Sequence, residues 1–320
     1  MKIHALGWLI ALPALVLPFA SCGQSTVACV AAHAGTAQAD QLGNAINWGY
    51  AATFTPKGAL PACASTTVYN APISNTAPTP PDALKQVTLD KLKGDIIGFE
   101  TYHPAKNTPD GIEPDFTKGS VAIKSQAFGY LLQRAQDTNA SDKPYALGDW
   151  TSMEPDSNDL CYVSNLKSAQ QDLPDVAAVK PDPMTMDPGL PEQVAVKASY
   201  EWSNVKVYVT AASQGTQFSA DLKYTQNDCS VDYSVLGVWP PIGCAALDKD
   251  GNLTDQPDDS ACCPNSDPNA GRAVGSGINP DFKVKCDPDL LLCVLDAPRG
   301  SASIPVLGGK DCPLAKASAQ

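Results

Sequence analysis

Three successive stretches of the chain alternate apolar and polar side chains with a period of two residues. They cover residues 205–210, 218–225 and 229–235. Such alternation is typical of strands that bury one face and expose the other. Short polar segments at 213–215 and 226–228 separate the three stretches, and turn residues in these places indicate hairpins. This part of the chain is therefore predicted to form an antiparallel meander with one solvated face.

Other segments extend the β-rich pattern. Strands are predicted at 47–55, 66–69 and 95–102, and a hairpin is predicted over 282–296 with its turn at Asp287-Pro288-Asp289. One helix is predicted over 125–138, because apolar residues recur there at helical spacing, namely Phe128, Leu131, Leu132 and Ala135. The 28 prolines and 23 glycines favour many turns over a helical bundle. We expect a mainly β fold, an antiparallel sandwich or meander with one or two helices.

The stretch 174–191 is rich in Pro and Asp, so we expect an irregular surface segment or a linker there. The first interpretation is a mainly β domain over 47–245 with a disulfide-rich extension over 246–320 packed on it. This extension is rich in Pro, Asp and Gly and is expected to be irregular. Two domains divided near 174–191 are the alternative.

The charge balance excludes one class of partner. The chain carries 22 Lys and Arg against 34 Asp and Glu, a formal net charge of −12. Nucleic-acid binding depends on basic patches that displace counterions, so no nucleic-acid partner is expected. None of the eleven cysteines forms a CxxC pair, which argues against a zinc ribbon, a thioredoxin-type redox site and c-type haem attachment.

The first 21 residues have the features of an export signal. A short positive start at Met1-Lys2 precedes an apolar run over 5–20, which is too short to span a bilayer comfortably. The run ends at Phe19-Ala20-Ser21-Cys22, which resembles the lipobox of bacterial lipoproteins, with Phe19 where that family usually carries Leu. The resemblance implies a signal peptide over 1–21, acylation of Cys22 by chains such as palmitate, and a lipid-anchored tether over 22–46.

The same resemblance implies a location. In the lipoprotein family an Asp after the acylated cysteine tends to retain the protein at the inner membrane, and this chain has Gly23 there. Sorting to the outer membrane is therefore expected, with the periplasmic and the surface face both open. The expected partners are the membrane, reached through the lipid anchor, and an unidentified protein or glycan.

Cysteine parity is an independent test of acylation at Cys22. If that thiol is acylated, ten of the eleven cysteines remain, an even number that can form five disulfides. The alternative is an ordinary secreted protein with one free thiol. Cys286 and Cys293 flank the predicted turn and are expected to pair, whereas the adjacent Cys262 and Cys263 are expected to have different partners. The remaining disulfide candidates are Cys29, Cys63, Cys161, Cys229, Cys244 and Cys312.

A metal or cofactor site is not expected. Asp248, Asp250 and Asn252 resemble the start of a calcium loop, but Leu253 and Asp259 stand where an EF-hand needs Gly and Glu. A looser oxygen cage around these residues remains an alternative to a solvated acidic loop, which is our first interpretation.

We expect the protein not to be an enzyme, because the sequence has no complete catalytic motif. The alternative is an envelope hydrolase with dispersed residues, in which Glu100, His103, Glu154 and Ser164 converge in one pocket. For a binding module, exposed tryptophans would be the first surface candidates, although burial in the core is the more common role of this residue. They are Trp150, Trp202 and Trp239.

Overall fold

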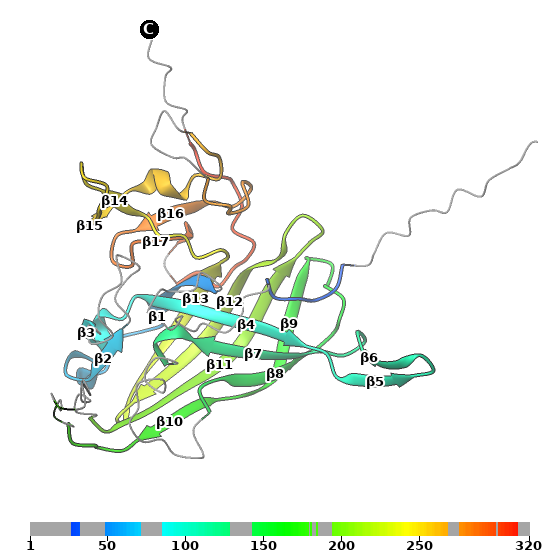
Figure 1. The fold of residues 1–320 in the computed structure, drawn as a ribbon, viewed down its shortest axis with the longest axis horizontal. Coiled ribbons are helices and arrows are strands. Elements are labelled where there is room, and N and C mark those ends of the chain that lie inside the picture. The colour runs from blue at the N-terminus through cyan, green and yellow to red at the C-terminus, as the bar shows by residue number, and fades with distance from the viewer. Residues whose placement is uncertain are drawn as a thin grey trace, which may run out of the picture.

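The computed structural model describes residues 27–32, 49–71, 85–128, 143–178, 180, 184, 194–267, 275–298 and 300–312. Its centre is one large antiparallel sheet (Figure 1). In chain order the strands of this sheet are β1 (Tyr50–Pro56), β4 (Gly94–Tyr102), β7 (Ser120–Ser125), β8 (Ala146–Trp150), β9 (Leu160–Lys167), β10 (Ala169–Leu173), β11 (Val196–Val209), β12 (Gln214–Gln226) and β13 (Cys229–Val238). The mainly β, antiparallel prediction is confirmed.

The sheet closes on itself. Strand β13 pairs with β1, as in Ala51 opposite Val238, and the order then follows the chain from β4 to β9. The long strand β11 pairs with β10 near its start and with β9 near its end, where Val207 lies opposite Cys161. Because β9 and β10 occupy successive stretches of one neighbour, the nine strands fill eight positions around the closed sheet. The predicted meander over β11 to β13 is thus one part of a continuous up-and-down arrangement.

Aromatic side chains fill the inside of the closed sheet. The rings of Tyr50, Phe99 and Phe218 are buried and lie with centroids 4.7 to 5.2 Å apart. A second group joins Phe128, Tyr200 and Tyr224 by the same kind of contact, at 4.6 and 4.8 Å. A closed sheet of this size has room either for side chains or for one small ligand. In this chain the described aromatic residues occupy that space.

Four small hairpins project from this sheet or follow it. They are β2 (Val68–Ala71) with β3 (Lys85–Thr88), β5 (Ala105–Thr108) with β6 (Gly111–Pro114), β14 (Ala245–Leu247) with β15 (Leu253–Pro257), and β16 (Val284–Asp287) with β17 (Leu292–Leu295). The last of these is the hairpin predicted over 282–296. Short 3₁₀ helices cover Ala62–Ser65, Leu89–Lys91 and Asp259–Cys262.

The C-terminal extension covers part of the outer face of the sheet. Ile96 of β4, Ala51 of β1 and Leu236 of β13 point outward and pack in one buried cluster with Phe282 and Val294 of the extension. The prediction of one solvated face is therefore wrong for the end of β13. Before the covered end, the outer position Asp232 is exposed and Ser230 is half-buried.

Two sequence predictions fall partly outside the described residues. Residues 126–128 are helical, but the rest of the helix predicted over 125–138, including Leu131, Leu132 and Ala135, lies outside the described part of the chain. Of the predicted tether over 22–46, only residues 27–32 are described. Where the chain is described, no helix is long and apolar enough to cross a membrane.

Candidate functional site

The site of most interest is the end of the closed sheet where the chain enters it. Residues 27–32 lie against this end, and Cys29, Ala31 and Ala32 are buried there. A disulfide joins Cys29 to Cys161 of β9, across 132 residues of sequence. Residues 27–32, the described part of the predicted tether over 22–46, are therefore fixed against the sheet by this disulfide and by the burial of the two alanines.

Backbone hydrogen bonds fix the same segment. The amide of Cys29 donates to the carbonyl oxygen of Met153 at 2.8 Å. The amide of Ala32 lies 3.0 Å from the carbonyl oxygen of Gly215 and 2.8 Å from the Tyr50 hydroxyl oxygen. Burial raises the pKa of Tyr50 above its ordinary value, so at neutral pH the hydroxyl keeps its proton and donates it to the Gly215 carbonyl.

A glycine makes the close approach possible. Gly215 has φ +71°, and a Cβ atom on it would lie 2.2 Å from the carbonyl oxygen of Val30. A side chain at this position would therefore displace the N-terminal segment. Cys22 precedes Val27 by five residues, so at most roughly 18 Å of extended chain connects them.

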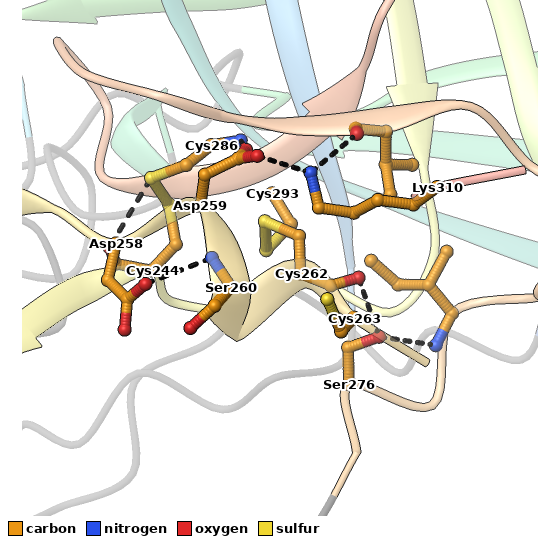
Figure 2. Close-up of a disulfide and its surroundings, with 12 residues drawn as sticks. Cys244, Asp258, Asp259, Ser260, Cys262, Cys263, Ser276, Cys286, Cys293 and Lys310 are labelled. Atoms are coloured by element: carbon orange, nitrogen blue, oxygen red, sulfur yellow. Dashed lines mark hydrogen bonds and ion pairs between the residues drawn. A yellow bond between two sulfur atoms is a disulfide. The ribbon is translucent and has the colours of Figure 1, made fainter. Parts of the chain in front are cut away.

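The ten predicted cysteines form five disulfides in the structure. The pairs are Cys29–Cys161, Cys63–Cys229, Cys244–Cys286, Cys262–Cys293 and Cys263–Cys312. Cys262–Cys293 and Cys263–Cys312 lie within the C-terminal extension, and Cys244–Cys286 joins the extension to a residue just before it. Figure 2 shows the Cys244–Cys286 and Cys262–Cys293 disulfides. The adjacent Cys262 and Cys263 bond to different partners, Cys293 and Cys312, as expected from their positions.

The predicted Cys286–Cys293 pair is wrong. These two residues lie directly opposite each other in β16 and β17, and the pairing of the two strands already holds them together. Their sulfurs bond instead to Cys244 and Cys262, whose Cα atoms lie 5.9 and 5.4 Å from those of their respective partners. The two disulfides therefore connect the hairpin to the segments beside it. The sulfurs of Cys244, Cys262 and Cys293 lie within 4.8 Å of one another, but disulfide sulfur is not the thiolate that a metal requires.

The proposed calcium ligands form a turn. The Asp248 carboxylate accepts hydrogen bonds from the amides of Asp250 and Asn252, both at 2.8 Å. The Asn252 side chain donates its N–H to the same carboxylate at 3.1 Å. The Asn252 amide is the main cause that lowers the pKa of Asp248. The carboxylate thus stabilises the turn between β14 and β15 by accepting these hydrogen bonds.

Two of the four hydrolase candidates, Glu100 and His103, lie in or directly after β4, and the other two lie after β8 and on β9. His103 follows β4, and its Nδ1 donates to the carbonyl oxygen of Lys118 at 2.8 Å. Ser164 of β9 donates to the carbonyl oxygen of Asp149 at 3.4 Å. Glu100 is half-buried in β4, and Glu154 is exposed after β8. None of the four lines either of the two cavities described next.

Those cavities were not predicted, because their walls come from distant segments. The larger has a volume of about 490 Å³ and lies between Tyr208 and Ser213 of the β11–β12 hairpin and residues 279–282 and 307–309 of the extension. The smaller, about 270 Å³, lies at β10, β11 and β12. Of the three tryptophans, Trp150 and Trp202 are buried and Trp239 is half-buried, so they do not form an exposed aromatic surface.

Comparison with known proteins places the chain in a family. The model of the MlpA family matches residues 79–240, half of the chain, which contain strands β4 to β13. A Myxococcus xanthus protein named "Putative lipoprotein MlpA" is 40% identical over 89 residues, which are 28% of this chain and 30% of that protein. The match thus spans less than a third of the relative's length. No solved structure matches. The chain, with its closed antiparallel sheet, belongs to the MlpA family of lipoproteins.

Proposed function

We propose that this chain is exported and anchored in the outer membrane through acylated Cys22, and that its folded part is a non-enzymatic binding or structural module. The observation that carries the proposal is the Cys29–Cys161 disulfide. It fixes the chain to one end of the sheet seven residues after Cys22, so an anchor at Cys22 would hold that end near the membrane.

The pairing of cysteines supports export. Disulfides persist in oxidising compartments such as the periplasm and are rare in the cytosol. The five disulfides use every cysteine except Cys22. An acylated Cys22 therefore leaves no free thiol in the mature protein.

The positions of the hydrolase candidates support the non-enzymatic assignment. A hydrolase needs its acid, base or nucleophile within hydrogen-bond reach of a common substrate atom. His103 bonds to Lys118 and Ser164 to Asp149, so neither contact joins two candidates. An unidentified protein or glycan is the partner we propose for the module.

Membrane fractionation of bacterial cells tests the anchor. Wild-type protein should sediment with membranes and incorporate a palmitate analogue, whereas Cys22→Ser should be unlabelled and lost from the membrane fraction. This variant leaves the five disulfides intact, so its oxidised mass and thermal unfolding are controls for folding. Equal labelling and sedimentation of the two proteins would contradict the proposal.

The residue after the anchor tests the sorting. Gly23→Asp should move the labelled protein from the outer to the inner membrane fraction, and Gly23→Ser should not. If Gly23→Asp leaves the protein in the outer membrane fraction, the sorting signal is not the one we propose, and the test with Cys22→Ser still decides whether Cys22 is acylated.

A further inference from the structure

We infer that the β5–β6 hairpin is a membrane contact, and that Ile112 and Phe116 enter the lipid surface on which the anchor holds the protein. The inference rests on the proposed anchor at Cys22. Four features of the described residues carry it: the place where the chain enters the sheet, the exposure of the two side chains, the support of the hairpin, and its reach.

The hairpin projects from the end of the sheet where the N-terminal segment lies. The amide of Ala31 donates to the Thr101 hydroxyl, 3.4 Å away, and Thr101 is the next-to-last residue of β4. Strand β5 begins at Ala105, three residues after β4 ends. Figure 1 shows the dark-blue segment 27–32 and the β5–β6 hairpin at this end, with β14 and β15 of the extension on the other side of the molecule.

The hairpin exposes large apolar side chains. Ile112 of β6 is 76% exposed and Phe116, just after β6, is 67% exposed. Tyr102, at the end of β4, is 50% exposed. Single exposed apolar residues are normal, but a group on one projecting element marks a contact surface. Aromatic side chains are also enriched at membrane interfaces.

Contacts at the base of the hairpin hold it in place. The amide of Asp115 donates to the carbonyl oxygen of Pro104 at 2.8 Å. The His103 ring lies edge-on to Phe116, with centroids 4.9 Å apart, and bonds to the Lys118 carbonyl. Phe116 is therefore supported on one side while its other side faces solvent.

The dimensions and charges fit a lipid surface. The four residues of β5 extend over roughly 13 Å. The chain between the anchor at Cys22 and Val27 can extend over at most roughly 18 Å, so the anchor and the hairpin can reach the same surface. From Ala105 to Lys118 the formal charge is −1, from two lysines and three acidic residues. We therefore expect apolar insertion at the headgroup boundary, without a requirement for anionic lipid.

Quenching by brominated lipid tests the contact. Acylated mature protein carrying Phe116→Trp is mixed with phosphatidylcholine vesicles that contain acyl-chain-brominated phosphatidylcholine. Its fluorescence is compared with that of wild type, and Leu247→Trp is the matched control. Leu247 is 62% exposed on β14 of the extension, so both substitutions lie on exposed positions that leave the core unchanged. Intact oxidised mass checks that each variant keeps its disulfides.

The expected result is extra quenching of Phe116→Trp over wild type and none of Leu247→Trp, with both proteins floating with the vesicles. If both float and neither is quenched, the hairpin does not touch lipid, and the inference fails while the anchor stands. A second copy or a protein partner on the hairpin would give this result. Equal quenching of the two variants would also overturn the inference. Failure to float would overturn the anchor and the inference together.

Discussion

The Tyr50 hydroxyl donates a hydrogen bond to the carbonyl oxygen of Gly215, 165 residues further along the chain. The same hydroxyl accepts a hydrogen bond from the Ala32 amide at 2.8 Å. One side chain inside the closed sheet thus joins the first strand, the β11–β12 hairpin and the N-terminal segment. In our account this junction fixes the end of the module that faces the membrane.

Gly215→Ala should weaken this junction. The new Cβ would meet the Val30 carbonyl oxygen and would also sit on a backbone with φ +71°. We expect the free energy of unfolding to fall by about 3 kcal/mol, from strain and displacement together. Denaturant titration measures the change.

Gly251→Ala is the control for backbone strain alone. Gly251 has φ +84°, and no atom lies within 4 Å of a Cβ built on it. A loss of about 1 kcal/mol is expected there. Equal losses at Gly215 and Gly251 would mean that the approach of Val30 to Gly215 contributes nothing to stability.

Buried tyrosines should make the fold sensitive to alkali. Burial raises the pKa of Tyr50, Tyr224 and Tyr233 above the ordinary value near 10. Because the pKa is higher in the folded state than in the unfolded state, each of these tyrosines makes a contribution to the free energy of unfolding that is fully present below pH 10. This contribution is lost as pH rises through the folded-state pKa. The free energy of unfolding should therefore fall steadily above pH 10.

Tyr233→Phe tests that alkaline slope. Its hydroxyl donates to the Leu89 carbonyl oxygen at 3.1 Å, so the variant should lose about 1 kcal/mol at pH 7. Its stability should then decline less steeply than that of wild type above pH 10. Parallel curves for the two proteins would contradict the assignment of this slope to buried tyrosines.

The ion pair between Lys310 and Asp259 should matter at neutral pH and disappear in acid. The Lys310 side chain is 8% exposed, and its Nζ lies 2.5 Å from Asp259 Oδ2 (Figure 2). Burial alone would raise the pKa of Asp259, but hydrogen bonds from Lys310 and the Cys286 amide hold it below its ordinary value. The contribution of this lowered pKa to the free energy of unfolding is present above pH 3.8 and is lost as pH falls through the folded-state pKa of Asp259.

Lys310→Met should therefore cost about 1 kcal/mol at pH 7, and the difference from wild type should narrow below pH 3.8. Chemical denaturation at pH 7, 4 and 3 follows the effect. Lys249→Met, at an exposed turn position, is the control and should change little. A difference that persists unchanged in acid would show that Lys310 acts through packing of its aliphatic chain.

The disulfide connectivity has its own test. Peptide mapping under non-reducing conditions should find Cys262 linked to Cys293 and Cys244 linked to Cys286. The double substitution Cys262→Ser with Cys293→Ser opens a loop across 31 residues and should lower the free energy of unfolding by about 3.7 kcal/mol in the chain-entropy model. A Cys286–Cys293 peptide in the map would contradict the structure.

Local patterns predicted β1, β4 and the strands β11 to β13, but neither β7 to β10 nor the closure of the sheet. The alternation over 205–235 predicts β11 to β13, because apolar residues alternate with polar residues in a strand that buries one face. Closure depends on pairs such as Ala51 with Val238, which no local pattern encodes. The covered outer face at the end of β13 did leave a signal. Residues 235–238 read Val-Leu-Gly-Val, a continuous apolar run typical of a strand buried on both faces.

The site was predictable only in part. The resemblance of residues 19–22 to a lipobox predicts the anchor at Cys22, and cysteine parity predicts that the other ten cysteines pair. Parity gives the number of disulfides but not their connectivity. The predicted disulfide between the cross-strand neighbours Cys286 and Cys293 is therefore wrong. The exposure of Ile112 and Phe116 follows from their place on a projecting hairpin, which their sequence neighbours do not reveal.

Intact mass of the purified protein under non-reducing conditions tests the central claim most directly. We predict a chain that begins at Cys22, carries acyl groups on that residue, and lacks two hydrogens for each of the five disulfides. An unacylated N-terminus, or thiols that still react with an alkylating reagent, would contradict the account.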